Sequence, residues 1–295
     1  MTPSSPHVVA LGGGHGLATT LGAVRHYAGR VTAVVSVADD GGSSGRLRQI
    51  AGIPAPGDLR RCLVAMAADD DSLWARAFEY RFRSGDLEGH ALGNLIIAGL
   101  ANVTGDFGQA LDVASQLLAA TGRVLPATSV PVVLKADVAG TEVVGQVNVA
   151  SSAGPIGAVS IVPPDAPVSD EVIDALVGAD QIVIGPGSLF TSILAVCAVP
   201  AIREVLASGT RARRIYVCNL RPQFPETAGF SDEDHLRAVL EHGITPDTVV
   251  TSTGTAVGPE EESMLGVPLV TADLARADGT GHDPDRLAAV LRLLT

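Results

Sequence analysis

The stretch Ser36–Arg48 reads SVADDGGSSGRLR and directly follows an apolar, strand-like run, Val31–Val37. Its charges and backbone amides would be left unpaired in a core, so it must lie at a surface or in a site. Successive glycines let several backbone N–H groups point into one concavity that suits an anion, and Arg46 and Arg48 can bind phosphate oxygens. The stretch therefore predicts a site for a phosphate-bearing ligand at the end of a strand.

Two adjacent carboxylates, Asp39 and Asp40, stand at the start of this stretch. Carboxylate oxygens can hold a divalent cation such as Mg²⁺, and an acidic residue at the end of a second strand can bind a ribose hydroxyl. Both interpretations stay open at the level of the sequence.

A first glycine-rich turn precedes this stretch. The apolar run Val8–Leu11 breaks into Gly12–Gly16, and apolar residues then recur at helical spacing. With Val31–Val37 this makes a strand, glycine loop, helix and strand, in which the start of the helix presents free N–H groups to an anion. The pattern would also suit a nicotinamide dinucleotide, but Leu17 occupies the position of the third glycine in that fingerprint.

Two further strands end in polar turns. Gln181–Ile184 is followed by Gly185–Ser188, and Arg213–Val217 is followed by Asn219, whose amide could bind a base edge or a sugar hydroxyl. In a parallel sheet the carboxyl ends of strands share one edge, so we expect all these turns to converge on one crevice.

Several polar residues are placed to start helices. Asp58 is expected to cap a helix that runs through Met66, and the neighbouring Arg60 and Arg61 could reach the anion site or lie on the surface. Ser72 and Asp106 are also expected to be N-caps.

Composition narrows the class of protein. The 295 residues are 46% hydrophobic but only 3% aromatic, which suits buried parallel strands built from small and branched side chains. The net charge of −12 argues against binding to a nucleic-acid backbone. No apolar run approaches the roughly 20 residues of a membrane span. The 3 cysteines are expected to be reduced, and we expect a cytoplasmic protein.

The expected fold is α/β, with a Rossmann-like, mostly parallel sheet and helices on both faces. One domain is expected over residues 1–295, with a small insertion rich in β-hairpins at about 123–165 that covers the site or forms a dimer surface. The acidic run Glu260–Glu262 is expected to be solvated.

The motifs together resemble a known family. ALGGGHGL (10–17), SVADDGGSSGRLR (36–48), GIPAPGDLRRCLVA (52–65), GHALGNL (89–95), IGPGSLFTSI (184–193) and YVCNLRPQFPETAGF (216–230) are similar to segments of the gluconeogenesis-factor family. Members of that family are bacterial cytoplasmic relatives of 2-phospho-L-lactate transferase. The resemblance covers the chain from Val8 to about His242.

The resemblance implies a Rossmann-like core that binds a UDP-sugar such as UDP-N-acetylglucosamine. It implies a regulatory role in growth on gluconeogenic carbon sources, cell shape and peptidoglycan synthesis, with a partner in cell-wall synthesis or signalling. The implied ligand-binding residues are Gly13, Gly14, His15, Gly16, Asp39, Asp40, Gly41, Gly42, Ser43, Ser44, Gly45, Arg46, Asn94, Gly187, Ser188 and Asn219.

An alternative is a transferase of the 2-phospho-L-lactate type, in which Mg²⁺ held by Asp39 or Asp40 would polarise a phosphoanhydride. No catalytic residue is assigned, and a homo-oligomer is expected.

Overall fold

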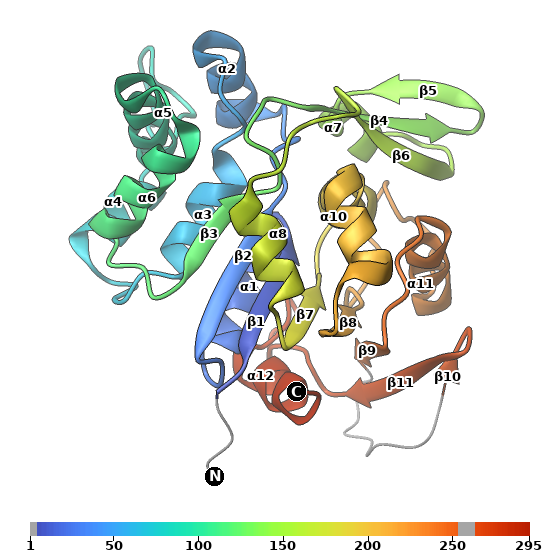
Figure 1. The fold of residues 1–295 in the computed structure, drawn as a ribbon. Coiled ribbons are helices and arrows are strands. Elements are labelled where there is room, and N and C mark those ends of the chain that lie inside the picture. The colour runs from blue at the N-terminus through green and yellow to red at the C-terminus, as the bar shows by residue number, and fades with distance from the viewer. Residues whose placement is uncertain (1–4, 253–262) are drawn as a thin grey trace.

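An eight-stranded sheet forms the centre of the molecule (Figure 1), in a computed structural model that describes residues 5–252 and 263–295. The predicted solvated run Glu260–Glu262 lies outside these residues. Neighbouring strands are parallel, except that β10 pairs antiparallel with β11. In spatial order the strands are β10 (Ser263–Met264), β11 (Val267–Ala272), β9 (Thr248–Ser252), β8 (Arg213–Val217), β7 (Gln181–Ile184), β1 (His7–Gly12), β2 (Arg30–Val35) and β3 (Arg123–Pro126). The predicted α/β class with a mostly parallel sheet is confirmed.

The central strands are apolar because helices cover both faces of the sheet. All residues of β1 and β7 are buried, as are those of β2 after Arg30. Ala10 of β1 lies opposite Ala33 on one side and Val183 on the other. Small and β-branched side chains at such positions pack well against two layers of helices.

Two groups of helices sandwich the sheet. On one face α1 packs against α3 and α12, and on the face toward the viewer in Figure 1 lie α8, α10 and α11. The helices of the first face are α1 (Gly14–Val24), α3 (Gly57–Ala65) and α12 (Pro284–Leu293). Those of the second face are α8 (Asp170–Val177), α10 (Pro200–Glu204) and α11 (Asp232–Glu241), with η1 (Leu189–Ile193), α9 (Leu194–Cys197) and η2 (Val205–Gly209) between β7 and β8.

A buried amide docks α12 onto the sheet. Gln181 Nε2 donates to the carbonyl oxygens of Leu291 (2.9 Å) and Leu294 (3.2 Å), and its Oε1 accepts from the Tyr27 hydroxyl. Burial raises the pKa of Tyr27, so this hydroxyl remains a donor at neutral pH. The three groups satisfy one another where water is excluded.

A helical lobe is inserted between β2 and β3, at upper left in Figure 1. In it α5 packs against α2, α4 and α6. Ser72 and Asp106 accept hydrogen bonds from backbone amides at the starts of α4 and α6, as predicted. The lobe consists of α2 (Gly42–Ala51), α4 (Leu73–Glu79), α5 (Leu92–Thr104) and α6 (Phe107–Leu117).

A second, antiparallel sheet of three strands lies above the carboxyl ends of the main strands (Figure 1). Its strands, in spatial order, are β5 (Thr141–Val144), β4 (Val133–Val138) and β6 (Ile156–Val162), with α7 (Gln146–Ala150) between β5 and β6 in the chain. The predicted insertion starts too early, because Arg123–Pro126 pairs with β2 in the main sheet. Strand β5 ends at Val144, and Gly145, which has a φ of +99°, turns the chain into α7.

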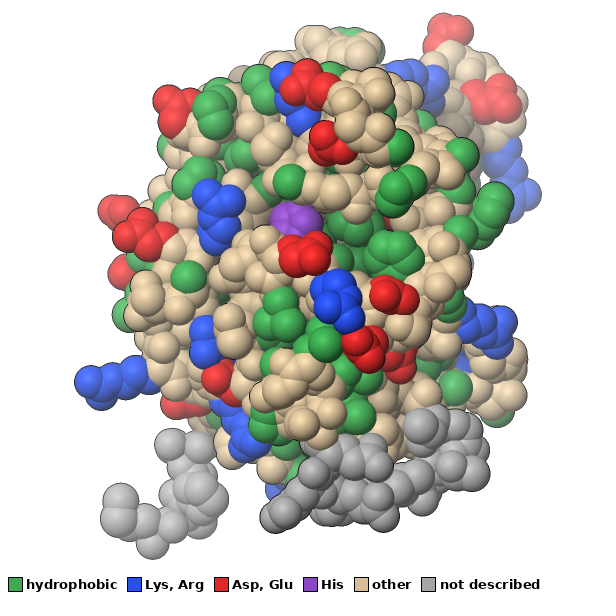
Figure 2. Space-filling view, turned by 90° about the vertical axis from the view of Figure 1, so that its right-hand side faces the viewer, with side chains coloured by type: hydrophobic (Ala, Val, Ile, Leu, Met, Phe, Trp, Pro, Cys, Tyr) green, Lys and Arg blue, Asp and Glu red, His purple; other side chains and the backbone are tan. Residues whose placement is uncertain are grey.

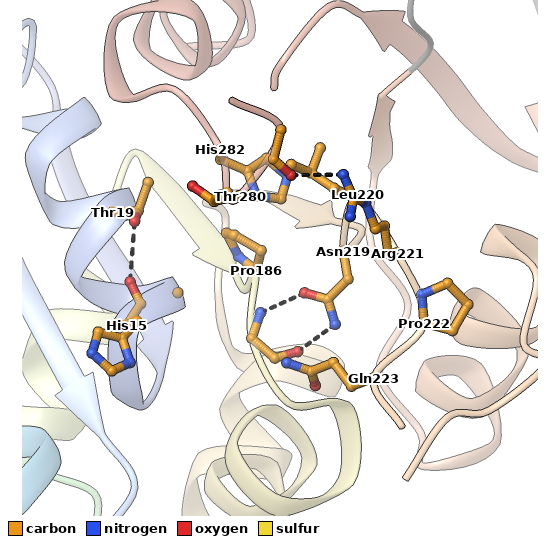
Figure 3. Close-up of a pocket in the computed structure, with 14 residues that line it drawn as sticks. His15, Thr19, Pro186, Asn219, Leu220, Arg221, Pro222, Gln223, Thr280 and His282 are labelled. Atoms are coloured by element: carbon orange, nitrogen blue, oxygen red, sulfur yellow. Dashed lines mark hydrogen bonds between the residues drawn. The ribbon is translucent and has the colours of Figure 1, made fainter. Parts of the chain in front are cut away.

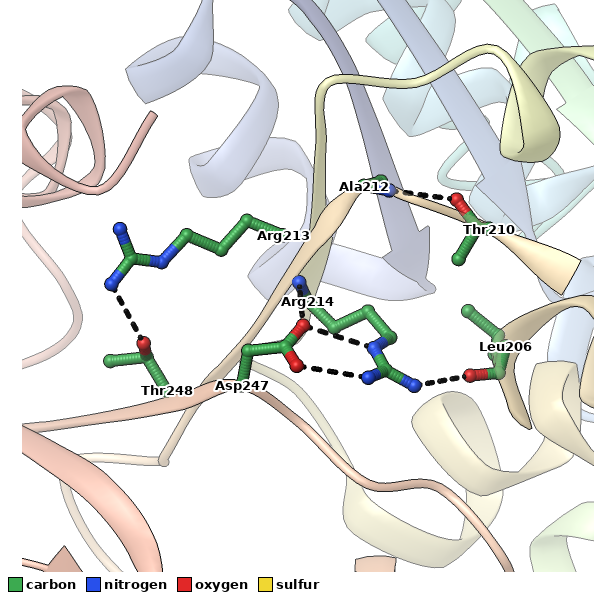
Figure 4. A network of polar contacts seen from close by, with 7 residues as sticks. All are labelled: Leu206, Thr210, Ala212, Arg213, Arg214, Asp247 and Thr248. Atoms are coloured by element: carbon green, nitrogen blue, oxygen red, sulfur yellow. Dashed lines mark hydrogen bonds and ion pairs between the residues drawn. The ribbon is translucent and has the colours of Figure 1, made fainter. Parts of the chain in front are cut away.

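The amino ends of β8 and β9 are joined by an ion pair (Figure 4). Arg214 donates from Nε to Asp247 Oδ2 (3.0 Å) and from Nη2 to Oδ1 (2.9 Å), and its Nη1 donates to the carbonyl oxygen of Leu206 (2.7 Å). The two-pronged geometry fixes the relative position of these strands and of η2.

The surface is chemically mixed. On the face that carries α11 and the small sheet, Lys and Arg side chains are scattered among Asp, Glu and apolar groups (Figure 2). Within the described ranges, no single helix meets the length and hydropathy of a membrane span. Leu189–Cys197 and Pro200–Gly209 meet them only as a pair bent by 81°. Cys62, Cys197 and Cys218 are buried and free, as predicted.

Candidate functional site

The turns that follow β1, β2, β7 and β8 meet at the carboxyl edge of the main sheet and enclose a cleft with two lobes. The first lobe has a volume of about 320 Å³ and the second of about 330 Å³. The residues that line both lobes are His15, Gly16, Gly187 and Gln223. The start of α1 and the β7 loop therefore lie between the two lobes.

The start of α1 faces the cleft with unpaired donors. Gly13 is the N-cap residue and makes no side-chain capping bond, and the Asp58 carboxylate accepts a hydrogen bond from the Gly14 amide, so an anion would use the N–H groups that follow Gly14 in this eleven-residue helix. Gly16 is required here because a Cβ at this position would lie 2.1 Å from the carbonyl oxygen of Pro186. This close approach puts the positive end of the α1 dipole against the β7 loop.

Asp58 faces the first lobe. Its Oδ1 accepts from Arg61 Nη1 at 2.7 Å, and both residues line the lobe. Burial raises the pKa of Asp58, the Arg61 cation opposes this shift, and the charge of Asp39 adds to it. The predicted N-cap role is wrong, because α3 begins at Gly57 with Pro56 as its N-cap. Asp58 is thus a carboxylate in the first lobe, held next to a guanidinium.

The paired aspartates separate. Asp39 lines the first lobe, where its Oδ1 accepts from the Gly41 amide at 2.9 Å. Asp40 turns to the small sheet and accepts from the amides of Gln146 and Val147, both at 3.0 Å, at the start of α7. The acidic pair in the first lobe is therefore Asp39 with Asp58, and the predicted pairing of Asp39 with Asp40 is corrected.

The predicted loop Gly41–Arg46 is mostly helical, because α2 starts at Gly42. Ser43 is buried and hydrogen-bonded to His90 Nδ1 (3.0 Å) and Asn94 Nδ2 (3.1 Å). These bonds fix the start of α2 against the helical lobe. Ser43 and Asn94 lie behind the wall of the first lobe and do not line it.

The arginines of the opening stretch bind backbone oxygens. Arg46 Nη2 donates to the carbonyl oxygen of Glu88 (2.9 Å), and Arg48 Nη1 donates to that of Val132 (2.5 Å). Arg60 pairs with Glu79 at 2.5 Å and is buried, whereas Arg61 lines the first lobe. Of these four cations, Arg61 is the one that reaches the first lobe.

His15 stands where the two lobes meet. Burial lowers its pKa, and the charge of Arg61 lowers it further. At neutral pH its imidazole is therefore uncharged and can donate or accept a hydrogen bond.

The β7 loop brings Gly187 and Ser188 into the first lobe, as predicted. The next helical turn, η1, does not offer its amides to a ligand, because Glu226 Oε1 accepts from Phe190 (3.0 Å) and Thr191 (2.8 Å). Burial raises the pKa of Glu226 and these amide bonds lower it. The carboxylate of Glu226 thus occupies the position of an anion at the start of η1. No local sequence pattern indicated this role of Glu226.

Asn219 braces the β7 loop. Its Oδ1 accepts from the Gly187 amide (3.0 Å) and its Nδ2 donates to the Gly187 carbonyl (2.8 Å), as Figure 3 shows. Both ends of its amide bond to Gly187, so Asn219 has a structural role, and its expected contact with a base edge or sugar stays a prediction.

The second lobe also contains residues beyond the strand-end turns. Arg221 Nη2 donates to the Gly279 carbonyl at 2.9 Å, which ties the β8 loop to the segment before α12 (Figure 3). Thr280 and His282 in this lobe, and Gln146 in the first lobe, are lining residues that pattern analysis missed. These three residues lie outside the quoted motifs and reach the cleft only through tertiary folding.

Comparisons of the whole chain with known proteins found a family match, relatives and a similar solved structure. The family described as 2-phospho-L-lactate transferase CofD matches residues 8–278. The gluconeogenesis factor of Bacillus subtilis (strain 168) is 42% identical, covering 80% of this chain and 75% of that protein. A Mycobacterium tuberculosis protein is 43% identical, covering 96% of this chain and 89% of that protein. A crystal structure of a UPF0052-family protein from Bacillus halodurans superposes with a TM-score of 0.89 at 34% identity, covering 97% and 98% of the two chains.

Proposed function

Because the chain belongs to the 2-phospho-L-lactate transferase CofD family, as a relative of its gluconeogenesis factors, we propose that it binds a nucleotide sugar in the cleft. The ligand is a UDP-sugar of the UDP-N-acetylglucosamine type. The diphosphate lies against the start of α1 and Gly187, where the two lobes meet.

The observation that carries this proposal is the start of α1. Its N-cap residue, Gly13, makes no side-chain capping bond, and the amides after Gly14, whose N–H bonds to Asp58, open onto the strip shared by the two lobes. A helix N-terminus with free amides favours phosphate through both hydrogen bonds and the helix dipole. The helical turn that follows β7, η1, already holds Glu226, and we assign the diphosphate to the start of α1.

The first lobe suits a sugar. Asp39 and Asp58 supply acceptors, Arg61 supplies donors, and Ser188 and Ser192 can do both. Sugar hydroxyls need such paired donors and acceptors when they leave water.

In the cell, we assign this binding a regulatory role in the cytoplasm, in growth on gluconeogenic carbon sources, cell shape and peptidoglycan synthesis. A homo-oligomer that contacts a protein of cell-wall synthesis or signalling would transmit the ligand state. Deleting the gene should cause a shape defect on gluconeogenic carbon that the wild-type chain reverses and the Gly16→Ala chain does not.

Calorimetry with the full chain tests the binding. UDP-N-acetylglucosamine and UDP-glucose should bind, with and without Mg²⁺, and should remain intact after prolonged incubation. Binding of GDP or NAD with no binding of either UDP-sugar would refute the proposal.

A second candidate is a Mg²⁺-dependent transferase, favoured by Asp39 and Asp58 in one lobe. The charge of Asp39 raises the pKa of Asp58, and a pair of carboxylates in one lobe fits a Mg²⁺ ion that keeps water and phosphate oxygens as its other ligands. In the described part of the chain, no group of three or more acidic, His or Cys side chains forms a fuller cage. A product that forms from a nucleotide-activated donor only with Mg²⁺ would support this candidate.

A further inference from the structure

The two lobes differ in chemistry. The first is lined by charged and hydroxyl side chains, whereas the second has apolar surfaces from Pro186, Leu220 and Pro222. Flat apolar groups suit the face of a planar ring, and the edges of such a ring need hydrogen-bond partners. The apolar side chains of the second lobe can therefore contact the face of a planar ring, and its polar groups determine which ring edge can bind.

His282 is the most confined polar group of the second lobe. It is 7% exposed, and burial lowers its pKa to about 4 while a hydrogen bond with the Cys218 backbone opposes the shift. In Figure 3 it lies among the residues around the cavity, near Thr280 and Pro186. The imidazole is thus neutral at pH 7.

The second ring nitrogen of His282 has no hydrogen-bond partner in the described part of the chain. Its Nε2 is buried and has no hydrogen-bond partner among residues 5–252 and 263–295. In a neutral imidazole that donates from one nitrogen, the other is an acceptor. A buried acceptor without a donor costs free energy unless a ligand supplies the missing N–H or O–H group.

Gln223 adds a second acceptor. Its Oε1 is also buried without a partner within the described part of the chain, and the residue lines both lobes. Arg221 supplies guanidinium donors at the same lobe, although one of its nitrogens is used by Gly279. Donors and acceptors thus lie beside apolar walls, and a nucleobase needs both kinds of group at its edge.

We propose that the second lobe binds the nucleobase and that His282 Nε2 accepts the ring N–H of a uracil-type base. The inference rests on the proposed function and adds its base specificity. The diphosphate then crosses at Gly16 and Gly187, and the sugar enters the first lobe. His282 is a specificity-determining residue that touches the ligand.

The test separates two sources of the N–H group, the base and an acetamido sugar. Calorimetry on the full chain uses UDP, its N3-methyl derivative, UDP-glucose and UDP-N-acetylglucosamine. UDP should bind at least about tenfold more tightly than N3-methyl-UDP, because methylation removes the donor and leaves His282 unpaired. The two UDP-sugars should lose affinity equally when His282 is changed.

Variants locate the effect. His282→Ala should weaken UDP binding about tenfold and bring the affinities for UDP and N3-methyl-UDP close together. His282→Gln, which restores an acceptor, should recover part of the affinity for UDP alone. The matched control is His235→Phe. His235 is also buried with an unpartnered Nε2 among the described residues, but it lines neither lobe.

Two results would overturn the inference and leave the proposed function intact. One is equal binding of UDP and N3-methyl-UDP by the wild-type chain, which needs no variant to fold. The other is a loss in His282→Ala that is confined to UDP-N-acetylglucosamine, which would put the sugar in the second lobe. Absence of binding by UDP and by both UDP-sugars would instead refute the proposed function itself.

Discussion

The side-chain amide of Asn219 and the peptide of Gly187 exchange two hydrogen bonds, of 3.0 Å and 2.8 Å, across 32 residues of sequence. The pair joins the end of β8 to the loop after β7 in the way that neighbouring strands pair. It thereby fixes the glycine loop where the two lobes of the cleft meet. The rigidity of this loop is set by a side chain from the next strand.

Replacing Asn219 should loosen the loop. Asn219→Ala leaves both polar groups of Gly187 without their partners, and we expect the free energy of unfolding to fall by about 1–3 kcal/mol. Urea unfolding measures this, with Asn102→Ala as the control because Asn102 makes one bond within α5. Equal losses in the two variants would contradict the bracing role.

Gly16 should tolerate no side chain. In Gly16→Ala the new Cβ meets the Pro186 carbonyl at 2.1 Å, so α1 and the β7 loop must move apart. We expect lower stability and loss of UDP-sugar binding. Gly99→Ala is the matched control, since a Cβ there has open space and alanine favours a helix by about 1 kcal/mol. Normal ligand affinity in Gly16→Ala would show that the approach of α1 to the loop is dispensable.

The two aspartates should respond differently to removal of charge. Asp40→Asn weakens the cap of α7 and should cost about 1 kcal/mol of stability, with ligand affinity within about twofold of the wild type. Asp39→Asn keeps the Oδ1 acceptor for Gly41 but removes charge from the first lobe. It should weaken ligand binding measured in the presence of Mg²⁺ about tenfold, as calorimetry can determine. Similar losses of ligand affinity in both variants would show that Asp40 also belongs to the binding site.

His282 should make the fold sensitive to acid. Its pKa is about 4 in the folded chain against 6.5 for an unperturbed histidine, so the unfolded chain binds more protons between these values. The stability that depends on a neutral His282 is therefore complete above pH 6.5 and is lost as pH falls towards 4. Between pH 7 and pH 5 the loss should be roughly 2 kcal/mol.

Urea unfolding at both pH values, in the wild type and in His282→Phe, isolates this contribution. The variant should lose less stability than the wild type on acidification, because its other titrating groups are the same. An identical loss of unfolding free energy in both proteins would show that protonation of His282 does not destabilise the fold.

Local sequence patterns predicted the strands of the main sheet but not the point at which the insertion begins. Val8–Leu11 and Gln181–Ile184 are short apolar runs ended by glycine, and such runs form strands wherever helices cover them. The run Arg123–Pro126 is short and partly apolar, like the strands of the small sheet that follows it in the chain. Its place beside β2 depends on pairing with residues 91 positions earlier in the chain, which no local pattern records.

The sequence by itself determined the α/β class, the polar turns at the strand ends and their convergence on one edge, because apolar strands and glycine turns are properties of adjacent residues. Tertiary structure decided which polar groups face the cleft. Asp40 is drawn away by the amides of Gln146 and Val147, while Asp58, predicted as a helix cap, and His282, from a segment without a motif, are brought into the cleft. A side chain's partner is set by packing across the fold, so the chemistry of the site emerged only once the strands were assembled.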